Sequence, residues 1–207
     1  MTRAEPLKRD RRREILDAAL ASFSELGYQQ TTIEHIRARS GASTGSIYHH
    51  FAGKEQLAAA IYLDGLASYQ DGLLVELERH KSAERGVRAI VHYHLDWIAA
   101  HQPLARFLLS MRHTEGVAAT EGEIRARRVD FFRRALAWFA PHIEAGAIRR
   151  LPAPVLVSLI IGPAQELGRH WLGRAADPEQ AKALRDARRL LADAAWNAIR
   201  TSEQNAP

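Results

Sequence analysis

Apolar residues recur at intervals of three and four positions through most of the chain, which is the spacing that places them on one face of an α-helix. The first such pattern lies between Asp10 and Leu26, with apolar positions Ile15, Leu16, Ala19, Leu20, Phe23 and Leu26. Gly27 follows directly, and glycine is the residue that most often closes a helix. The pattern therefore predicts an amphipathic helix that stops at Gly27.

A short helix is predicted between Gly27 and Gly41, in the segment "TTIEHIRARSG". Thr31 as N-cap with Glu34 three residues later has the pattern of a capping box, and Ile33 and Ile36 supply an apolar face. A third short helix fits residues 44–50. A fourth is predicted from near Lys54 to about Glu78.

Five further segments have helical periodicity and are bounded by Gly, Pro or a polar cap: 83–101, 103–113, 121–147, 152–174 and 177–200. No segment alternates long enough to predict a strand, and a polar tail follows Arg200. We therefore expect an all-α protein of about nine helices.

Two short helices joined by a tight turn at Gly41 form the helix-turn-helix pattern, in which the second helix lies in the major groove of DNA. If Ile47 faces the core, Gly45 and His49 point to nearly the opposite side. An outward glycine costs the helix about 1 kcal/mol relative to alanine. This cost makes sense if the backbone must closely approach another surface.

The polar groups around this glycine suit a DNA surface. The hydroxyls of Thr44 and Ser46 can bond base edges or phosphates, and Tyr48 and His49 can reach the phosphate walls. Lys54 begins the next helix, where a positive side chain and free backbone N–H groups predict a phosphate site. The alternative interpretation is that "TGS" is only a turn and that the rings are surface or packing residues.

Composition excludes several other classes. The chain has 207 residues, 46% of them hydrophobic, which is enough for a substantial core. No apolar run approaches the roughly 18 residues needed to cross a membrane, and the first twenty residues lack the apolar region of a secretory signal. We expect a cytoplasmic protein. The absence of cysteine excludes disulfides, thiolate zinc sites and a cysteine nucleophile.

The charge is positive, at +5 with a pI near 9.9, which favours polyanions only mildly. Residues 1–54 carry nine basic and six acidic side chains, so most of the excess lies there. The run "KRDRRR" is the densest part. A solvated helix start explains this run as well as contact with nucleic acid does.

The segments "TTIEHI", "SGASTGSIYHHF" and "GKEQL" strongly resemble the N-terminal signature of the TetR family of transcriptional regulators. The resemblance is dense from about Arg11 to Leu57. It implies a helix-turn-helix DNA-binding domain at 1–56, followed by a helical effector-binding and dimerisation domain at 57–207. It also implies DNA-contacting positions at Thr32, Thr44, Gly45, Tyr48, His49 and Lys54. Adding the neighbouring hydroxyls, the candidate DNA-binding set is Thr32, Ser43, Thr44, Gly45, Ser46, Tyr48, His49 and Lys54.

One position departs from the family pattern. Arg37 stands where these proteins usually have a small alanine that packs against the recognition helix. An arginine can lay its stem along a groove and expose its charge, so this departure bears on the local packing and not on the fold.

The C-terminal region carries weaker signals. The resemblance implies a bundle that binds a small ligand and forms a homodimer through its last two helices. The last helix has a stripe with small residues at helical spacing, which allows close packing: Leu184, Ala187, Leu191, Ala194 and Ala198. The helix before it is apolar around much of its circumference. The alternative is that both helices fill the core of a monomer.

Polar or aromatic groups within these apolar helices are the candidate effector contacts: His92, Trp97, Arg106, Met111, Phe132, Trp138, Glu166 and His170. Their composition favours a small, mostly apolar effector with one or two polar handles. His92 and Asp96 share a helix face, but His94 points away from them. We therefore expect neither a metal site nor a cofactor.

Together these features predict a repressor that binds a palindromic operator as a homodimer and is released by a small-molecule effector. A constitutive DNA-binding or nucleoid protein without an effector is the main alternative. A helical enzyme is a remote one, because the sequence contains no nucleophile elbow, phosphate-binding glycine loop or metal-spaced cluster.

Overall fold

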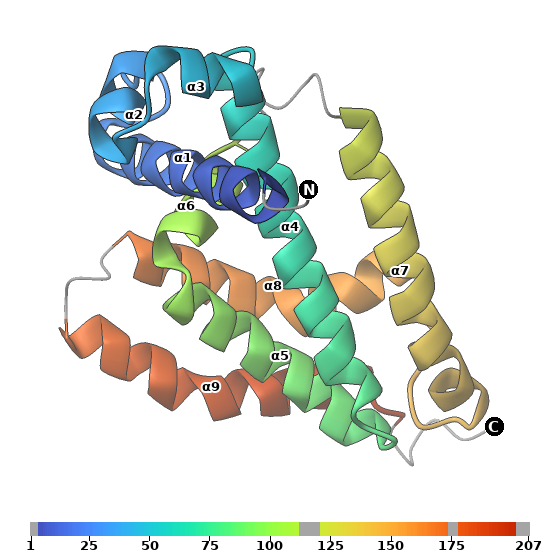
Figure 1. Cartoon of the computed structure of the whole chain (residues 1–207). Coiled ribbons are helices and arrows are strands. Elements are labelled where there is room, and N and C mark those ends of the chain that lie inside the picture. Colours follow the sequence, from blue (N-terminus) through green and yellow to red (C-terminus); the bar gives the residue numbers. More distant parts are fainter. Residues whose placement is uncertain (1–3, 112–120, 174–177, 202–207) are drawn as a thin grey trace. The chain divides into compact units, whose positions relative to one another are not determined.

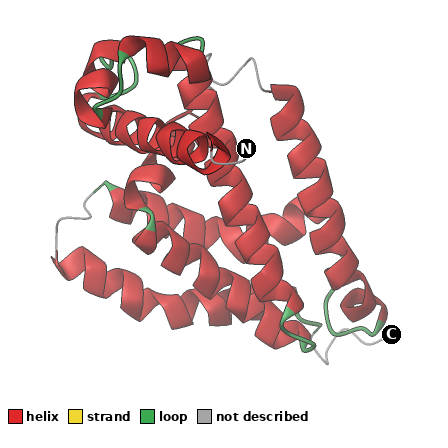
Figure 2. Cartoon of the chain, in the orientation of Figure 1, coloured by secondary structure: helices red, strands yellow, loops and turns green. Residues whose placement is uncertain are grey.

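The computed structural model describes residues 4–111, 121–173 and 178–201. These residues form nine helices (Figures 1 and 2). The helices are α1 (Ala4–Leu26), α2 (Ile33–Ser40), α3 (Thr44–His50), α4 (Lys54–Glu78), α5 (Ala83–Ala100), α6 (Gln102–Met111), α7 (Glu121–Glu144), α8 (Ala153–Leu172) and α9 (Pro178–Ile199). The described ranges contain no strand beyond one isolated bridge between Ile148 and Arg200. The all-α prediction is confirmed.

The predicted bounds of α3 and α4 agree with the structure. Helix α1 begins at Ala4, earlier than the predicted Asp10. Its added turns contain Ala, Leu, Lys and Arg, which favour helix even without an apolar stripe. The end of the predicted helix at 103–113 lies outside the described residues.

The start of α2 differs from the prediction, because Thr32 and not Thr31 is the N-cap. The Thr32 hydroxyl accepts a hydrogen bond from the His35 N–H at 3.3 Å, and His35 Nδ1 accepts one from the Thr32 N–H at 3.2 Å. Thr31 is buried, and its hydroxyl donates to the carbonyls of Gly27 (2.8 Å) and Ser22 (3.1 Å). Thr31 therefore fixes the α1–α2 loop, and the capping box lies one residue later than expected.

One compact unit consists of residues 1–67 and 103–125. Its core is formed by residues from α1 to α4, with Phe107, Met111 and Ile124 from later in the chain. The rings of Phe23 and Phe107 stack with their centroids 5.5 Å apart. Helix α6 therefore supplies part of the core on which the helix-turn-helix is built.

The other compact unit consists of residues 68–102 and 126–207. Helix α5 packs against α8 and α9, which also pack against each other. A Cβ on Gly168 would lie 2.6 Å from Ile98 Cδ1, so a larger residue there would displace the end of the Ile98 side chain between α5 and α8. Arg88 of α5 forms an ion pair with Asp193 of α9. The core side of α9 contains Ala192, Ala195 and Ile199.

These units do not divide the chain at residues 56 and 57. Helix α4 is continuous and contributes residues to both units, and α7 does the same. Helix α6 belongs by packing with the N-terminal helices, although it follows α5 in sequence. The boundary predicted from the sequence remains a functional hypothesis, because compactness follows packing and not chain order.

Candidate nucleic-acid interface

The orientation of α3 is set by its two ends. At the start, Ser43 Oγ accepts a hydrogen bond from the Ser46 N–H at 3.1 Å. At the other end, Phe51 is buried, and its N–H donates to the Ile47 carbonyl at 2.9 Å. Ile47 itself has 0% exposure. With this side fixed in the core, the rotation of the helix is determined.

The opposite side of α3 faces solvent. Thr44, Gly45, Tyr48 and His49 are exposed, and Tyr48 retains 54% of its accessible surface. A Cβ built on Gly45 would meet nothing within 4 Å. Packing among the described residues therefore does not require a glycine at position 45. The predicted outward face of this helix is present in the structure.

Helix α2 leads into α3 through a turn that needs glycine. Gly41 has a φ of 63°, in the left-handed region, and its N–H donates to the Arg37 carbonyl at 3.1 Å. Arg37, the departure from the family pattern, is exposed and forms a two-bond ion pair with Glu34 at 2.6 and 2.8 Å. This pairing leaves the α2–α3 packing undisturbed.

Lys54 has an internal role that the sequence did not indicate. Its Nζ donates to the carbonyls of Tyr28 (3.0 Å) and Gln29 (3.2 Å) and lies 4.7 Å from the centroid of the Tyr28 ring. The side chain thus ties the start of α4 to the loop after α1. One of its three N–H donors remains for another partner, because an ammonium group carries three.

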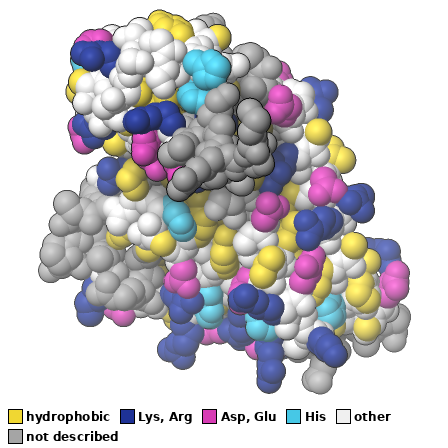
Figure 3. Space-filling view, in the orientation of Figure 1, with side chains coloured by type: hydrophobic (Ala, Val, Ile, Leu, Met, Phe, Trp, Pro, Cys, Tyr) yellow, Lys and Arg dark blue, Asp and Glu magenta, His cyan; other side chains and the backbone are white. Residues whose placement is uncertain are grey.

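The arginines of the basic run whose side chains the structure describes are paired with acidic groups. Arg11 pairs with Glu14 at 2.8 Å, Arg12 with Asp64 at 3.6 Å, and Arg13 with Asp17 at 3.2 Å. The side chains of Lys8 and Arg9 lie outside the described residues. On the face seen in Figure 3, basic and acidic side chains are interspersed and do not gather in one basic patch. The solvated-face interpretation suits Arg11 and Arg13.

The candidate effector residues are not brought together by the fold. Met111 lies in the core of the first unit, and Arg106 is exposed on α6. Glu166 and His170 are exposed on α8 and pair with each other at 3.3 Å. Phe132 is 39% exposed. These positions were chosen for polarity within apolar helices, and their side chains turned out to lie on the outer sides of those helices or in another core.

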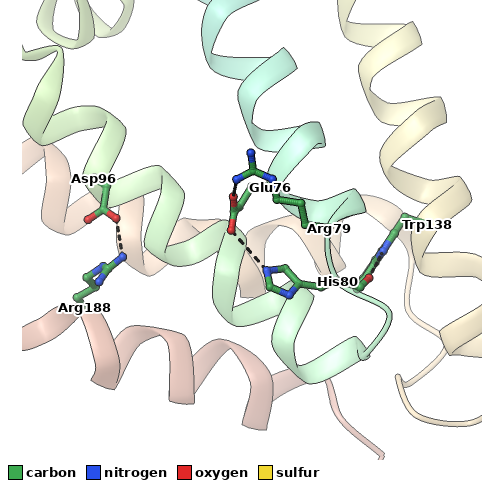
Figure 4. Close-up of polar contacts among 6 residues, drawn as sticks. All are labelled: Glu76, Arg79, His80, Asp96, Trp138 and Arg188. Carbon is green, nitrogen blue, oxygen red and sulfur yellow. Dashed lines mark hydrogen bonds and ion pairs between the residues drawn. The ribbon is translucent and has the colours of Figure 1, made fainter.

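Trp138 and His92 have local partners. Trp138 Nε1 donates to the His80 carbonyl at 3.0 Å, as Figure 4 shows. His92 is half-buried, and burial together with the nearby Arg188 lowers its pKa. Asp96, its possible partner in a metal site, forms an ion pair with Arg188 at 2.5 Å (Figure 4). The described residues contain no group of three or more side chains arranged to hold a metal ion.

The sequence analysis missed a buried polar cluster on α4 and α5. The Tyr69 hydroxyl and His94 Nδ1 are 2.7 Å apart, and the Tyr69 ring contacts Trp97 with centroids 5.2 Å apart. Burial raises the pKa of Tyr69 and lowers the pKa of His94 to about 4. Both are therefore neutral near pH 7. The signal was present in "VHYHLDW", where polar residues interrupt an apolar helix.

Comparison with known proteins places the N-terminal domain. Residues 15–61 match the family model "Bacterial regulatory proteins, tetR family". Over 88 residues the chain is 39% identical to the HTH-type transcriptional regulator BetI of Escherichia coli O127:H6. The matched segment covers 42% of this chain and 45% of BetI. The match thus spans less than half the length of this curated relative. Among the described residues, no helix is both long and apolar enough to span a membrane.

Solved structures share the fold along nearly the whole chain. A TetR family transcription regulator from Marinobacter aquaeolei VT8 superposes with a TM-score of 0.78 at 21% identity, covering 96% of this chain and 100% of that one. FadR from Bacillus subtilis, solved in complex with stearoyl-CoA, gives 0.67 at 18% identity, covering 86% and 96%. BetI and these solved proteins are described as transcriptional regulators. Residues 15–61 thus match the TetR family of bacterial regulatory proteins, and the chain as a whole has the fold of solved TetR family regulators.

Proposed function

We propose that the chain is a DNA-binding transcriptional regulator that reads duplex DNA with the outward face of α3. The observation that carries this proposal is the combination of a fully buried Ile47 with an open Gly45 on the other side of the same helix. A missing side chain at Gly45 lets the backbone approach the floor of the major groove. Thr44, next to it, is placed to meet base edges.

The other candidates fit the phosphate walls. Tyr48 and His49 are exposed on the last turn of α3, and Thr32 and Lys54 begin α2 and α4. Helix N-termini attract phosphate oxygens through their free N–H groups. Ser43 and Ser46 are weaker candidates, because the Ser43 hydroxyl already accepts the bond that caps α3 and Ser46 is half-buried.

We further propose a homodimer formed through α8 and α9 on a palindromic operator. Helix α9 buries Ala192, Ala195 and Ile199 within its own chain, while Leu190 is 63% exposed. Val155 of α8 is 43% exposed. From the predicted stripe, Ala194 is exposed and Leu191 is half-buried, and the Leu184 side chain lies outside the described residues. Apolar area of this kind on both helices supports a second copy as the partner.

We propose that a small-molecule effector releases the protein from its operator. FadR of Bacillus subtilis was solved with stearoyl-CoA, so at least one protein of this fold binds an acyl ligand. In this chain α4 begins beside α3 and continues into the unit that contains Tyr69 and His94. A ligand that moves the later turns of α4 would thereby move its start. A constitutive DNA-binding protein would lack this response.

The test begins by recovering genomic DNA fragments bound by the full-length protein and measuring the affinity for the enriched site. Thr44→Ala should weaken binding to that site by about tenfold and relax the preference at one base pair, since one base contact is worth about 1–3 kcal/mol. Ser24→Ala, at an exposed position of α1, is the matched control. Unchanged affinity and base preference in Thr44→Ala would remove α3 as the reading helix.

A further inference from the structure

Six buried side-chain atoms of the second unit have no hydrogen-bond partner among the described residues. Two are the Nε atoms of Arg127 and Arg188, whose guanidinium groups form ion pairs through another nitrogen. The other four belong to uncharged side chains: Gln70 Oε1, His94 Nε2, Trp97 Nε1 and Trp171 Nε1. The four residues are 5%, 7%, 6% and 4% exposed. A buried polar group without a partner costs about 1–3 kcal/mol, and native proteins tolerate only a few. Several in one unit require an explanation.

Two of these residues contact Tyr69. His94 and Trp97 lie one turn apart on α5, and both rings contact the Tyr69 ring, with centroids 5.6 and 5.2 Å away. Gln70 follows Tyr69 on α4. Trp171 lies on α8, the helix that packs against α5 where Gly168 meets Ile98. Two of the unpartnered atoms, His94 Nε2 and Trp97 Nε1, therefore belong to one aromatic cluster on α4 and α5, and a third belongs to Gln70, the next residue after Tyr69.

The protonation of the cluster determines what its partner must offer. We assign the Tyr69 hydroxyl as the donor and His94 Nδ1 as the acceptor, because the described residues offer this buried hydroxyl no other acceptor. A neutral imidazole that accepts at Nδ1 carries its proton on Nε2. His94 Nε2 is thus a donor, as are the indole N–H groups of Trp97 and Trp171. Gln70 Oε1 is the one acceptor, and donors predominate.

The partner should be neutral. Tyr69, Gln70, His94 and Trp97 are all uncharged, and none of them forms an ion pair. Burying an unpaired carboxylate or ammonium among such groups costs far more than burying a neutral oxygen. A carbonyl-type oxygen accepts from the imidazole and indole N–H groups, while an apolar body packs against the rings.

We propose that Tyr69, Gln70, His94 and Trp97 form the effector site, and that the effector is an uncharged molecule with an apolar body and a carbonyl-type oxygen. The proposal rests on the effector response proposed above and gives it a chemical class. It replaces most of the sequence-predicted effector set, from which only Trp97 is retained. The competing explanation is that ordered water alone satisfies these atoms.

The test uses three probes of similar size on the full-length protein: acetophenone, which has the carbonyl, ethylbenzene, which lacks it, and benzoate, which carries a charge. With indole ¹⁵N-labelled tryptophan, each Nε1–H gives one NMR signal. Acetophenone should move the Trp97 signal downfield as a hydrogen bond forms. Trp138 is an internal control, because its Nε1 already donates to the His80 carbonyl (Figure 4). Ethylbenzene and benzoate should bind at least fivefold more weakly.

His94→Phe keeps an aromatic ring but removes the N–H, and it should weaken acetophenone binding about 5- to 10-fold, the value of one net hydrogen bond. It should leave ethylbenzene binding unchanged. His170→Phe, at a side chain that is 76% exposed, is the matched control. If His94→Phe fails to fold, Tyr69→Phe tests the same cluster, because it frees Nδ1 and allows the imidazole proton to move from Nε2.

Three results would overturn the proposal: no Trp97 shift with millimolar acetophenone, equal binding of ethylbenzene, or tighter binding of benzoate. The first would leave water as the explanation. Operator affinity is measured separately and without any probe. If the probes fail to bind as predicted while the protein still binds its operator, this inference alone is refuted. If the protein binds no operator, the proposed function is refuted and the result with the probes is unaffected.

Discussion

Replacing Gly45 with alanine separates the stability of α3 from its proposed use. Gly45 lies within a helix, its φ is not in the left-handed region, and a Cβ there would meet nothing within 4 Å. The folded chain therefore has no need of glycine at this position. If a DNA surface approaches the backbone here, the added methyl group obstructs it. The same change should stabilise the fold and weaken operator binding.

The two effects have opposite signs and measurable sizes. Alanine is favoured over glycine in a helix by about 0.8–1 kcal/mol, which corresponds to an increase in Tm of roughly 2–4 °C for a chain of this size. A misfit at one base pair costs about 1–3 kcal/mol, or roughly 5- to 150-fold in affinity for each half-site. In a dimer that binds two half-sites, the loss of binding free energy occurs at both half-sites.

Thermal unfolding and titration of the recovered operator at one fixed salt concentration measure the two effects. Gly122→Ala is the control, because a Cβ on that exposed glycine of α7 also meets nothing within 4 Å. It should leave operator affinity unchanged. A Gly45→Ala variant that gains stability and binds operator normally would show that the open face of α3 does not contact DNA closely.

Four further substitutions test individual contacts. Lys54→Met should lower the unfolding free energy by about 2 kcal/mol, because two hydrogen bonds to carbonyls are lost. If the remaining N–H binds phosphate, the slope of log K for operator binding against log salt should also shrink by about 1. Lys54→Arg is the control, and an unchanged slope in Lys54→Met excludes the phosphate contact. Thr31→Val should lower the unfolding free energy by about 1–2 kcal/mol, because the hydrogen bonds that hold the α1–α2 loop are lost. Thr32→Val should lower it by about 1 kcal/mol, because the N-cap of α2 is lost. Urea unfolding measures both, and equal stability of Thr31→Val and wild type would refute the role of Thr31 in the loop. Burial lowers the pKa of His94 from 6.5 in the unfolded chain to about 4 in the folded protein. Between these values the unfolded chain binds the extra proton, so the unfolding free energy of the wild type should fall by roughly 3 kcal/mol as the pH falls from 6.5 to 4. His94→Gln should reduce this fall in acid-unfolding measurements, and an unchanged pH dependence would assign the titration to another group.

The local fold followed from the sequence wherever a pattern had a single physical interpretation. The buried Ile47 and the glycine at Gly41 determine the helix-turn-helix almost without reference to the rest of the chain, and both behave as predicted. The N-cap of α2 did not, because Thr31 and Thr32 are equally good caps in isolation. The choice was made by the carbonyls of Ser22 and Gly27, which come from the end of α1.

The candidate effector set could not be predicted in the same way, because polarity within an apolar helix does not say which way a side chain points. Glu166 and His170 were chosen on that ground and are exposed. His94 was set aside because it points away from His92, yet that direction places it against Tyr69. The packing of α4 against α5 determines which residues of α5 face Tyr69. The spacing of residues along a single helix cannot predict that packing.

Both proposed sites lie where a local rule of stability is broken. Gly45 weakens α3 without any gain in packing, and the unpartnered atoms of Gln70, His94 and Trp97 weaken the core of the second unit. Such losses persist in a native protein when something outside the isolated chain offsets them. For a glycine on an open helix face the compensating partner is a surface, because only close approach uses a missing side chain. For the buried donors we propose the effector as this partner, because an acceptor oxygen on a molecule that fits among the side chains can reach them. The two kinds of loss therefore indicate two kinds of ligand, as a regulator that couples DNA to an effector requires.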